Sequence, residues 1–245
     1  MLKSKRSRNL WQMFIPFFGV AFLFFIPLLL PAPAEDVEIR PEKAQFEVFM
    51  DGQEIGKESF TIEVTGDTIT TRSTATFRNL GIRRQKVQME SELSMDRHYL
   101  PRTYQLRTDV GGQKGTIKGT FGDGEAIFEY RESDNPRKRG LLVGDTFVVL
   151  DTNVFHHFIF LVRLFDFAPN KRQSIEVVIP QALDGGILKV NEIGIEKVMV
   201  GAKQRDLRHL RADSGLLQID LWIDDQRTLY KIAMPAKNIE VLRKS

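Results

Sequence analysis

The chain has 245 residues and no cysteine, which excludes a disulfide framework and thiol chemistry. Its formal net charge of +3 comes from residues 1–34, which hold four basic residues and no acidic one. Removing those four from the 35 basic residues leaves 31 against 32 acidic ones, a net charge of −1 for residues 35–245. No basic stripe with interleaved aromatic residues appears there, so we expect no nucleic acid as a partner.

The first 34 residues have the pattern of a secretory signal peptide. A basic start precedes an uncharged apolar run from Leu10 to Leu30, and Ala32-Pro33-Ala34 forms a small-x-small cleavage site. We therefore expect cleavage after Ala34 and an exported, periplasmic protein of a bacterial cell envelope. The run is also close to the roughly 17–25 residues that can span a bilayer. The alternative is an uncleaved anchor in the inner membrane, formed by residues 10–30, and membrane contact is expected only through this segment.

The sequence from residue 44 to residue 132 alternates between apolar and polar positions, which is typical of strands with one buried face. Turn residues separate the predicted strands, as at Asp51-Gly52, Gly66-Asp67 and Gly122-Asp123-Gly124. The basic run Arg137-Lys138-Arg139 follows the turn-like residues 133–136. We expect this run to lie in a loop.

Residues 151–167 break the alternation and predict one helix. Asp151, Thr152 or Asn153 can cap its start by accepting a backbone N–H, and Pro169 can end it. Apolar residues cover more than one stripe of this segment, so we expect the helix to be buried on most sides.

The strand pattern resumes after the helix. The predicted strands are 174–179, 187–192, 196–201, 205–212, 216–223, 228–234 and 239–243. About a dozen strands in series predict an all-β fold with a single, strongly curled antiparallel sheet. This sheet would form a partial or closed barrel wrapped around the one apolar α-helix. No linker is visible, so residues 35–245 are expected to form a single β-rich envelope domain after the signal peptide.

His156 and His157 are the sharpest candidates for chemistry. Adjacent helical residues point about 100° apart, so the pair does not suit one metal ion. We expect no metal and no other cofactor. The simplest interpretation gives both histidines hydrogen-bond partners inside the fold. The functional alternative is a polar patch of Asn153, His156 and Arg163, which share a helix face and could orient a ligand at the mouth of an apolar cavity.

Three stretches of the chain resemble exported bacterial β-sheet proteins of unknown function, the uncharacterised periplasmic domain families. These stretches are FEVFMDGQEIGKESFTIE at 46–63, VVLDTNVFHHFIFLVRLFD at 148–166 and IDLWIDDQRTLYKIAMP at 219–235. By shape, such proteins are similar to bacterial lipoprotein carriers, whose half-open barrel shelters acyl chains beside helices. The resemblance implies a fold and supplies no catalytic residue, because a fold does not fix a function.

The leading hypothesis is a non-enzymatic envelope protein that binds an apolar or lipid-like ligand inside the curled sheet. The side chains expected to contact this ligand are Phe155, Phe158, Ile159 and Phe165. The side chains expected to orient its polar end are Asn153, His156 and Arg163. The alternative is a structural or interaction module with a filled core, whose exposed strand edge pairs with an envelope protein. A hydrolase with a histidine base is a weaker alternative, since no nucleophile or oxyanion motif is visible.

Overall fold

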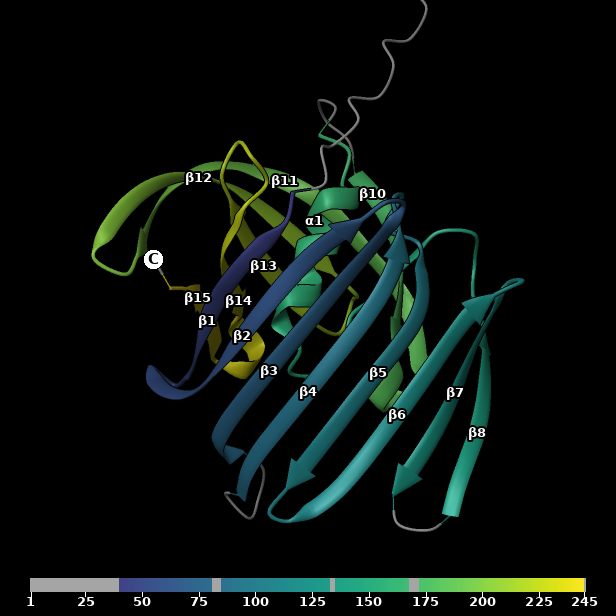
Figure 1. The fold of residues 1–245 in the computed structure, drawn as a ribbon. Helices are drawn as coiled ribbons and strands as arrows, with labels where there is room; N and C mark the ends of the chain where they lie inside the picture. Colours follow the sequence, from purple (N-terminus) through teal and green to yellow (C-terminus); the bar gives the residue numbers. More distant parts are fainter. Residues whose placement is uncertain (1–39, 81–84, 133–134, 168–171, 245) are drawn as a thin grey trace, which may run out of the picture. The chain divides into compact units, whose positions relative to one another are not determined.

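In the part of the chain that the structure describes, fifteen strands form one continuous sheet that curls around a single short helix (Figure 1). The computed structural model describes residues 40–80, 85–132, 135–167 and 172–244. All of them belong to one of the two units into which the chain divides, Val37–Ser245. The described part of the chain contains no helix that is long and apolar enough to cross a membrane.

The strands follow one another along the sheet almost in chain order. The order is β8-β7-β6-β5-β4-β3-β2-β1-β15-β14-β13-β12-β11-β10-β9, and every neighbouring pair is antiparallel except β9 and β10. The strands of the first half are β1 Glu42–Met50, β2 Gln53–Thr65, β3 Thr68–Leu80, β4 Gln85–Asp96, β5 Pro101–Val110, β6 Gln113–Gly122, β7 Glu125–Glu132, β8 Asn135–Leu142 and β9 Phe147–Val149. Those of the second half are β10 Arg172–Ile179, β11 Asp184–Val200, β12 Lys203–Asp213, β13 Gln218–Ile223, β14 Leu229–Met234 and β15 Ile239–Arg243.

The sheet is strongly bent but does not close on itself. Its register shifts at five places, between β1 and β2, β3 and β4, β4 and β5, β11 and β12, and β13 and β14. Such bulges bend a strand and increase its twist, which brings the two ends of a long sheet toward each other. The terminal strands β8 and β9 are not paired with each other, so the architecture is a partial barrel. The predicted all-β fold with one curled sheet around a helix is confirmed.

The helical segment is shorter than predicted. It consists of the 3₁₀ turn η1, Phe155–His157, followed by the α-helix α1, Phe158–Leu164. None of the three expected residues caps it, because η1 begins after Val154, whose apolar side chain makes no capping hydrogen bond. Asn153 has a φ of 62°, in the left-handed region, which is incompatible with a helix and tolerated by asparagine. At the other end, Phe165 is extended, and Pro169 lies outside the described residues.

Two strand predictions also require correction. The predicted strands 187–192 and 196–201 are parts of one strand, β11, whose bulge at Glu192 and Gly194 resembles a turn signal in the sequence. The basic run Arg137-Lys138-Arg139 lies in β8 and not in a loop, because it pairs with β7. Pairing with a neighbour overrides the weak local signal of three consecutive charges.

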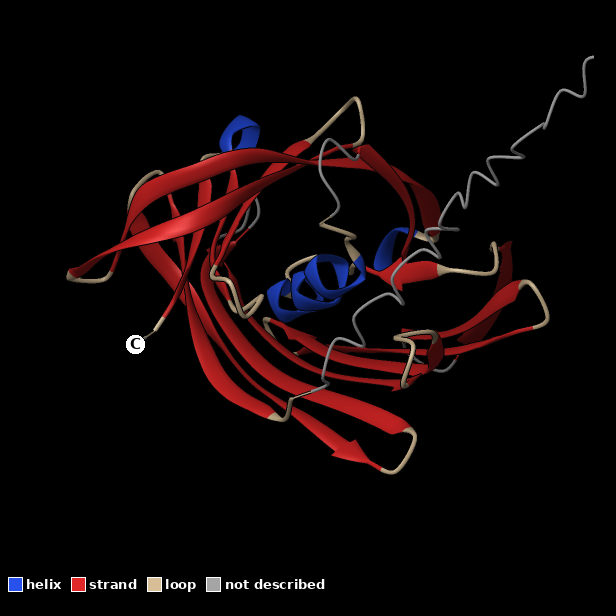
Figure 2. Cartoon of the chain, turned by 90° about the horizontal axis from the view of Figure 1, so that it is seen from above, coloured by secondary structure: helices blue, strands red, loops and turns tan. Residues whose placement is uncertain are grey.

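The core fills the space between the concave face of the sheet and the helix, and the view along the barrel shows strands around most of the helix (Figure 2). Every residue of α1 from Phe158 to Val162 is buried. Short 3₁₀ turns, η2 Pro180–Ala182 and η3 Pro235–Lys237, lead into β11 and β15. These turns and the start of the helical segment contribute to the candidate site.

Candidate functional site

A buried glutamate from the sheet holds the start of the helical segment. Glu58 lies at an inward position of β2, and its side chain is fully buried. Its Oε2 accepts the backbone N–H groups of Phe155 and His156 over 2.9 and 3.0 Å. Its Oε1 lies 2.7 Å from His156 Nδ1. With the ring N–H assigned to Nδ1, His156 donates this hydrogen bond to the carboxylate. Glu58 therefore performs the capping that was predicted for residues 151–153.

The turn before the helical segment is fixed by a second buried carboxylate. Asp151 Oδ2 accepts the hydroxyl of Tyr104 over 2.6 Å, and Oδ1 accepts the backbone N–H groups of Thr152 and Gln181. Burial raises the pKa of Asp151, although these hydrogen bonds oppose the shift. Burial, followed by the nearby Asp151 charge, raises the pKa of Tyr104 well above its usual value. Together, Glu58 and Asp151 tie the segment to β2 and β5.

His157 lies between these two anchors but is bonded to neither. Its two ring nitrogens have no hydrogen-bond partner among the described residues, and His156 Nε2 has none either. The His157 ring meets the edges of His156 and Tyr104, with centroids 4.5 and 5.8 Å away. Burial, assisted by the neighbouring His156, lowers the pKa of His157 well below its usual value, so its imidazole is neutral. The prediction of internal partners thus holds for one nitrogen of His156 and fails for His157.

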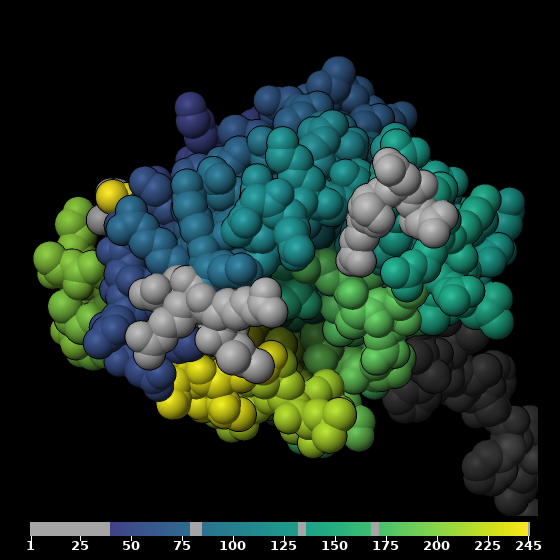
Figure 3. Space-filling model, turned by 90° about the horizontal axis from the view of Figure 1, so that it is seen from below, coloured from purple at the N-terminus to yellow at the C-terminus, as the bar shows by residue number. Residues whose placement is uncertain are grey.

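An apolar pocket of about 380 Å³ opens beside the start of the helical segment. It lies between η1, the first residues of α1 and the strands of the second half of the sheet. Figure 3 shows this end of the molecule, where the green surface of β10 and β11 and the yellow surface of the C-terminal strands border a recess. The apolar side chains that line the pocket are Leu150, Phe155, Phe158, Val177, Ile179, Ile187, Leu188, Leu216, Leu217, Ile219, Met234 and Ile239.

The pocket exists because β11 lacks side chains at the point where it faces the helix. Gly186 belongs to the same alternating set as the buried Leu188 and Val190, so a side chain there would point inward. A Cβ built on Gly186 meets no atom within 4 Å. On the opposite wall, Phe155 and Phe158 are buried in the core but still line the pocket.

Polar groups stand at several points on the wall of this pocket. They belong to Asp151, Thr152, Asn153, Asp184, Ser214 and Lys237. Asp151 is occupied by the three hydrogen bonds described above. Lys237 is exposed and has no acidic partner among the described residues. A few polar groups around an apolar cavity are typical of sites for small amphiphilic molecules.

The pocket brings together three of the seven residues predicted to bind a ligand. Asn153, Phe155 and Phe158 line it. His156 is turned toward Glu58 and stacks on Phe60, with ring centroids 5.4 Å apart. Ile159 and Phe165 are buried in the core, outside the pocket.

Arg163 is the seventh predicted residue and lies on the last turn of α1. Its Nη2 donates to Glu42 Oε2 over 3.0 Å, and Glu42 also accepts from Arg243. Arg163 therefore ties the end of α1 to β1. Asn153, His156 and Arg163 do not form the polar patch that a longer helix would have made.

Sequence reasoning missed the residues that fix and shape this site. Glu58 carried a signal, because it takes an inward position in a strand whose next inward residues are Phe60 and Ile62. Nothing in the sequence pointed to Lys237 or Gly186, since a surface lysine and a glycine beside a turn are ordinary features. Their role depends on which strands the curled sheet brings near residue 155.

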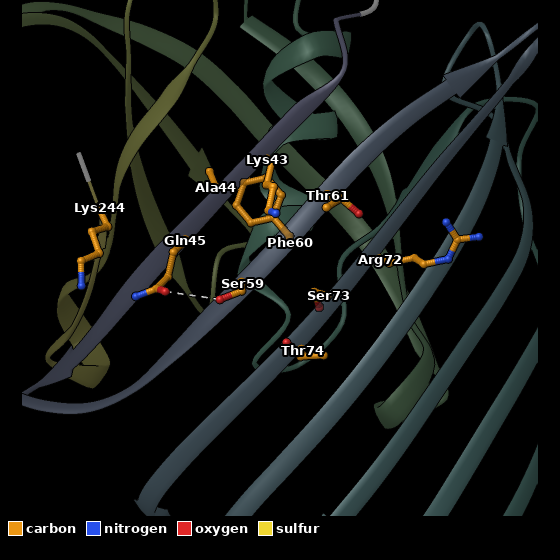
Figure 4. Close-up of a pocket in the computed structure, with 10 residues that line it drawn as sticks. All are labelled: Lys43, Ala44, Gln45, Ser59, Phe60, Thr61, Arg72, Ser73, Thr74 and Lys244. Atoms are coloured by element: carbon orange, nitrogen blue, oxygen red, sulfur yellow. Dashed lines mark hydrogen bonds between the residues drawn. The ribbon is translucent and has the colours of Figure 1, made fainter.

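A broader hollow of about 550 Å³ lies over β1, β2 and β3 (Figure 4). Two of its three charged groups are already paired: Arg72 bonds to Glu63 and Glu92 over 2.9 and 2.8 Å, and Lys244 lies 3.1 Å from Glu47. Gln45 and Ser59, on neighbouring strands, are joined by a hydrogen bond of 3.4 Å. The hollow lies on the convex face of the sheet, since Gln45 and Ser59 alternate with the buried Phe46 and Phe60. We therefore regard the pocket beside the helix as the better candidate.

The described residues contain no group of histidine and acidic side chains arranged to hold a metal ion. Fold and site together define a class of half-open antiparallel barrels with an internal helix and an apolar pocket beside it. Residues 45–238 match the model of a family described as a protein of unknown function, DUF3108, and the chain belongs to this family.

Among solved structures, the chain is similar to a β-barrel-like protein of the domain of unknown function DUF1849 from Brucella abortus. The two share 11% sequence identity with a TM-score of 0.57, over 83% of this chain and 94% of that one. A DUF1089 family protein from Pseudomonas aeruginosa matches with 13% identity and a TM-score of 0.47, over 74% of this chain and 90% of that one. The search of curated proteins found no match. The likeness to the Brucella protein supports the β-barrel-like fold.

Proposed function

We propose that this protein binds an apolar or lipid-like molecule in the pocket beside the helix, without a catalytic step, in a bacterial cell envelope. The pocket itself is the observation that carries the proposal. Its volume of about 380 Å³ falls in the range of roughly 300–1,000 Å³ that small-molecule sites occupy. Each methylene group moved from water into such a pocket contributes about 0.8 kcal/mol, so a short acyl chain gains several kcal/mol.

The polar end of the ligand would remain at the wall where Asn153, Ser214 and Lys237 stand. Lys237 supplies a positive charge without an acidic partner among the described residues. A carboxylate or phosphate headgroup matches the charge of Lys237, and it would have to lie away from Asp151 and Asp184, whose carboxylates also line the pocket. An anionic amphiphile with one acyl chain is therefore the ligand class that fits this wall.

The envelope location rests on the sequence pattern of residues 1–34. A basic start, an apolar run and a small-x-small site support export, and cleavage after Ala34 would release the β-rich part. The intact mass of the protein purified from a bacterial periplasm tests this part of the proposal. A mass that includes residues 1–34, found in the membrane fraction, would support the anchored alternative instead.

A hydrolytic function has less support from the geometry. His156 Nδ1 is bonded to Glu58, and the nitrogens of His157 contact no hydroxyl group among the described residues. A histidine base needs a nucleophile or a water-reactive substrate within hydrogen-bond distance. Both rings are fully buried, away from the pocket wall.

A titration with dodecanoate, read by calorimetry or by ligand NMR, tests the proposed binding. Gly186→Phe fills the pocket, because its side chain would point into space now bordered by Phe155 and Phe158. We expect the wild type to bind and Gly186→Phe to lose at least tenfold in affinity.

Gly122→Phe is the matched control for this titration. Gly122 is also a strand glycine with no atom within 4 Å of a built Cβ, and it lies on β6, outside the pocket. Its affinity should equal that of the wild type. Absence of saturable binding to the wild type, or equal affinity in Gly186→Phe, would contradict the proposed site.

A further inference from the structure

The two ends of the sheet differ in how they are covered. At one end, β9 consists of three buried residues, Phe147–Val149, which pair in parallel with β10. At the other end, β8 pairs only with β7, and no described strand lies on its other side (Figure 1). The described side chains of β8 from Pro136 to Gly140 are exposed, and Leu142 is 85% exposed. The outer edge of β8 is therefore an unpaired strand edge.

The hydrogen-bond pattern shows which backbone groups this edge offers. Val143 donates its N–H to the carbonyl of Gly124 over 2.9 Å, just beyond the pair that Leu142 makes with Glu125. In an antiparallel pair, successive residues alternate between bonding to the partner and pointing away from it. The N–H groups of Lys138, Gly140 and Leu142 therefore point away from β7. Pro136 belongs to the same set, where its missing N–H removes no bond to β7.

The side chains of this edge carry a charge that nothing in the described structure neutralises. Arg137, Lys138 and Arg139 are consecutive and exposed, and none has an ion-pair partner among the described residues. Pairing of β8 with the β8 of a second copy would place these three basic side chains opposite one another. Like charges directly opposite in a sheet are destabilising, whereas opposite charges are favourable. The edge thus disfavours its own copy and favours an acidic strand.

We propose that β8 binds an extended acidic segment of a partner protein, which adds a strand to the free edge of the sheet. The backbone groups of Lys138, Gly140 and Leu142 would form the ladder, as in other cases of strand addition. Successive side chains of a strand point to opposite faces, so Arg137 and Arg139 share one face of β8 and Lys138 shares the other with Leu142. Carboxylates at alternate positions of the incoming strand would lie opposite Arg137 and Arg139. The exposed Leu142 would pack against an apolar residue near one end of that strand. This interaction is independent of the proposed ligand pocket.

Exposed charges on an edge strand also occur where they only prevent aggregation. The full-length protein and a short synthetic peptide of alternating glutamate and valine distinguish the two roles. The first measurement is amide hydrogen exchange with and without the peptide. We expect new protection at the amides of Lys138, Gly140 and Leu142, and none with a peptide in which lysine replaces glutamate. Unchanged exchange at these three amides would overturn the proposal.

The second measurement compares two charge-reversal variants with equal net charge. One carries Arg137→Glu, Lys138→Glu and Arg139→Glu on the edge. The other carries the same change at three exposed lysines away from the edge, Lys57, Lys114 and Lys118. We expect the edge variant to lose about tenfold or more in affinity for the acidic peptide, and the control to lose much less. Equal losses in both variants would mean non-specific attraction and would overturn the proposal.

Discussion

Glu58 illustrates how a single side chain determines where the helical segment begins. Its carboxylate accepts two backbone N–H groups and one ring N–H from Phe155 and His156, all of them buried. A helical segment of ten residues has little stability of its own, because nucleation is unfavourable. The position of this segment, and of the aromatic wall of the pocket, therefore depends on a contact made by a strand almost a hundred residues earlier.

Glu58→Ala should be strongly destabilising, because it leaves three buried donors without an acceptor. We expect a loss of about 3–5 kcal/mol in the free energy of unfolding, measured by urea denaturation. Glu54→Ala, at an exposed position of the same strand, should stay within about 0.5 kcal/mol of the wild type. Equal urea midpoints for Glu58→Ala and the wild type would show that the carboxylate does not hold the segment.

His157→Leu should not destabilise the protein at neutral pH. The imidazole makes no hydrogen bond in the described structure, so an apolar side chain removes two unsatisfied polar atoms. We expect unchanged stability or a gain of about 1 kcal/mol in the free energy of unfolding. A clear loss of stability in urea denaturation would mean that the ring nitrogens have partners in solution.

The lowered pKa of His157 gives the same variant a second readout. The folded protein keeps this ring neutral, whereas the unfolded chain protonates it below about pH 6.5. Protons therefore bind preferentially to the unfolded state, and stability falls as the pH drops below that value. Urea denaturation between about pH 7 and pH 5 should show a steeper decline for the wild type than for His157→Leu. Equal slopes would contradict a neutral, buried His157.

At the scale of elements, a hydrogen-bonded network on the face turned away from the main core links the neighbouring strands β11, β12 and β13. His209 lies 2.8 Å from both Glu196 and Asp220, which flank its ring. Trp222 stacks on His209 and donates its Nε1 to Glu196 over 2.9 Å. Val198, Val200 and Leu207 pack with Trp222 in a small apolar cluster separate from the main core.

This network should weaken in acid. Hydrogen bonds from Trp222 and His209 lower the pKa of Glu196. Burial opposes the same shift in Asp220, but hydrogen bonds from Arg211, His209 and Gln218 lower its pKa overall. Their stabilising effect is present above the unfolded values of about 4 and is lost as the pH falls through the lower folded values.

Fluorescence of Trp222 measures this change, and Trp222→Phe identifies its signal. Trp11, the other tryptophan of the chain, contributes only where residues 1–34 are retained. We expect the emission of Trp222 to shift toward that of exposed tryptophan below about pH 4, while circular dichroism still reports strands. A shift that begins well above this pH, or that accompanies global unfolding only, would contradict the role of the two carboxylates.

The elements differ in how far the sequence predicts them. Strands β2 to β7 follow from local alternation, because one face of each is buried against the core. β8 could not be predicted, because its sequence does not alternate between apolar and polar residues. It is extended because it pairs with β7. The predicted helix, residues 151–167, was too long at both ends. The left-handed backbone of Asn153 and the extended backbone of Phe165 end the helix, and neither conformation is visible in the pattern of apolar residues.

At the scale of the whole molecule, the proposed function rests on the incomplete filling of a curled sheet. Fifteen strands wrapped around ten helical residues enclose more space than the helix fills, and the glycines of β11 leave a pocket beside it. Sequence reasoning placed Asn153, Phe155 and Phe158 at the ligand, and these three line the pocket. It could not predict the other wall, because β11, β13 and β15 approach residue 155 only after the sheet curls.

The most direct test of the central claim is native mass spectrometry, with lipid extraction, of the full-length gene product exported in a bacterium. We predict a stoichiometric apolar adduct on the wild type and on Gly122→Phe, and none on Gly186→Phe. Equal adducts on all three proteins would place the ligand elsewhere. A ligand-free mass for the wild type, with no lipid in the extract, would contradict the proposed function.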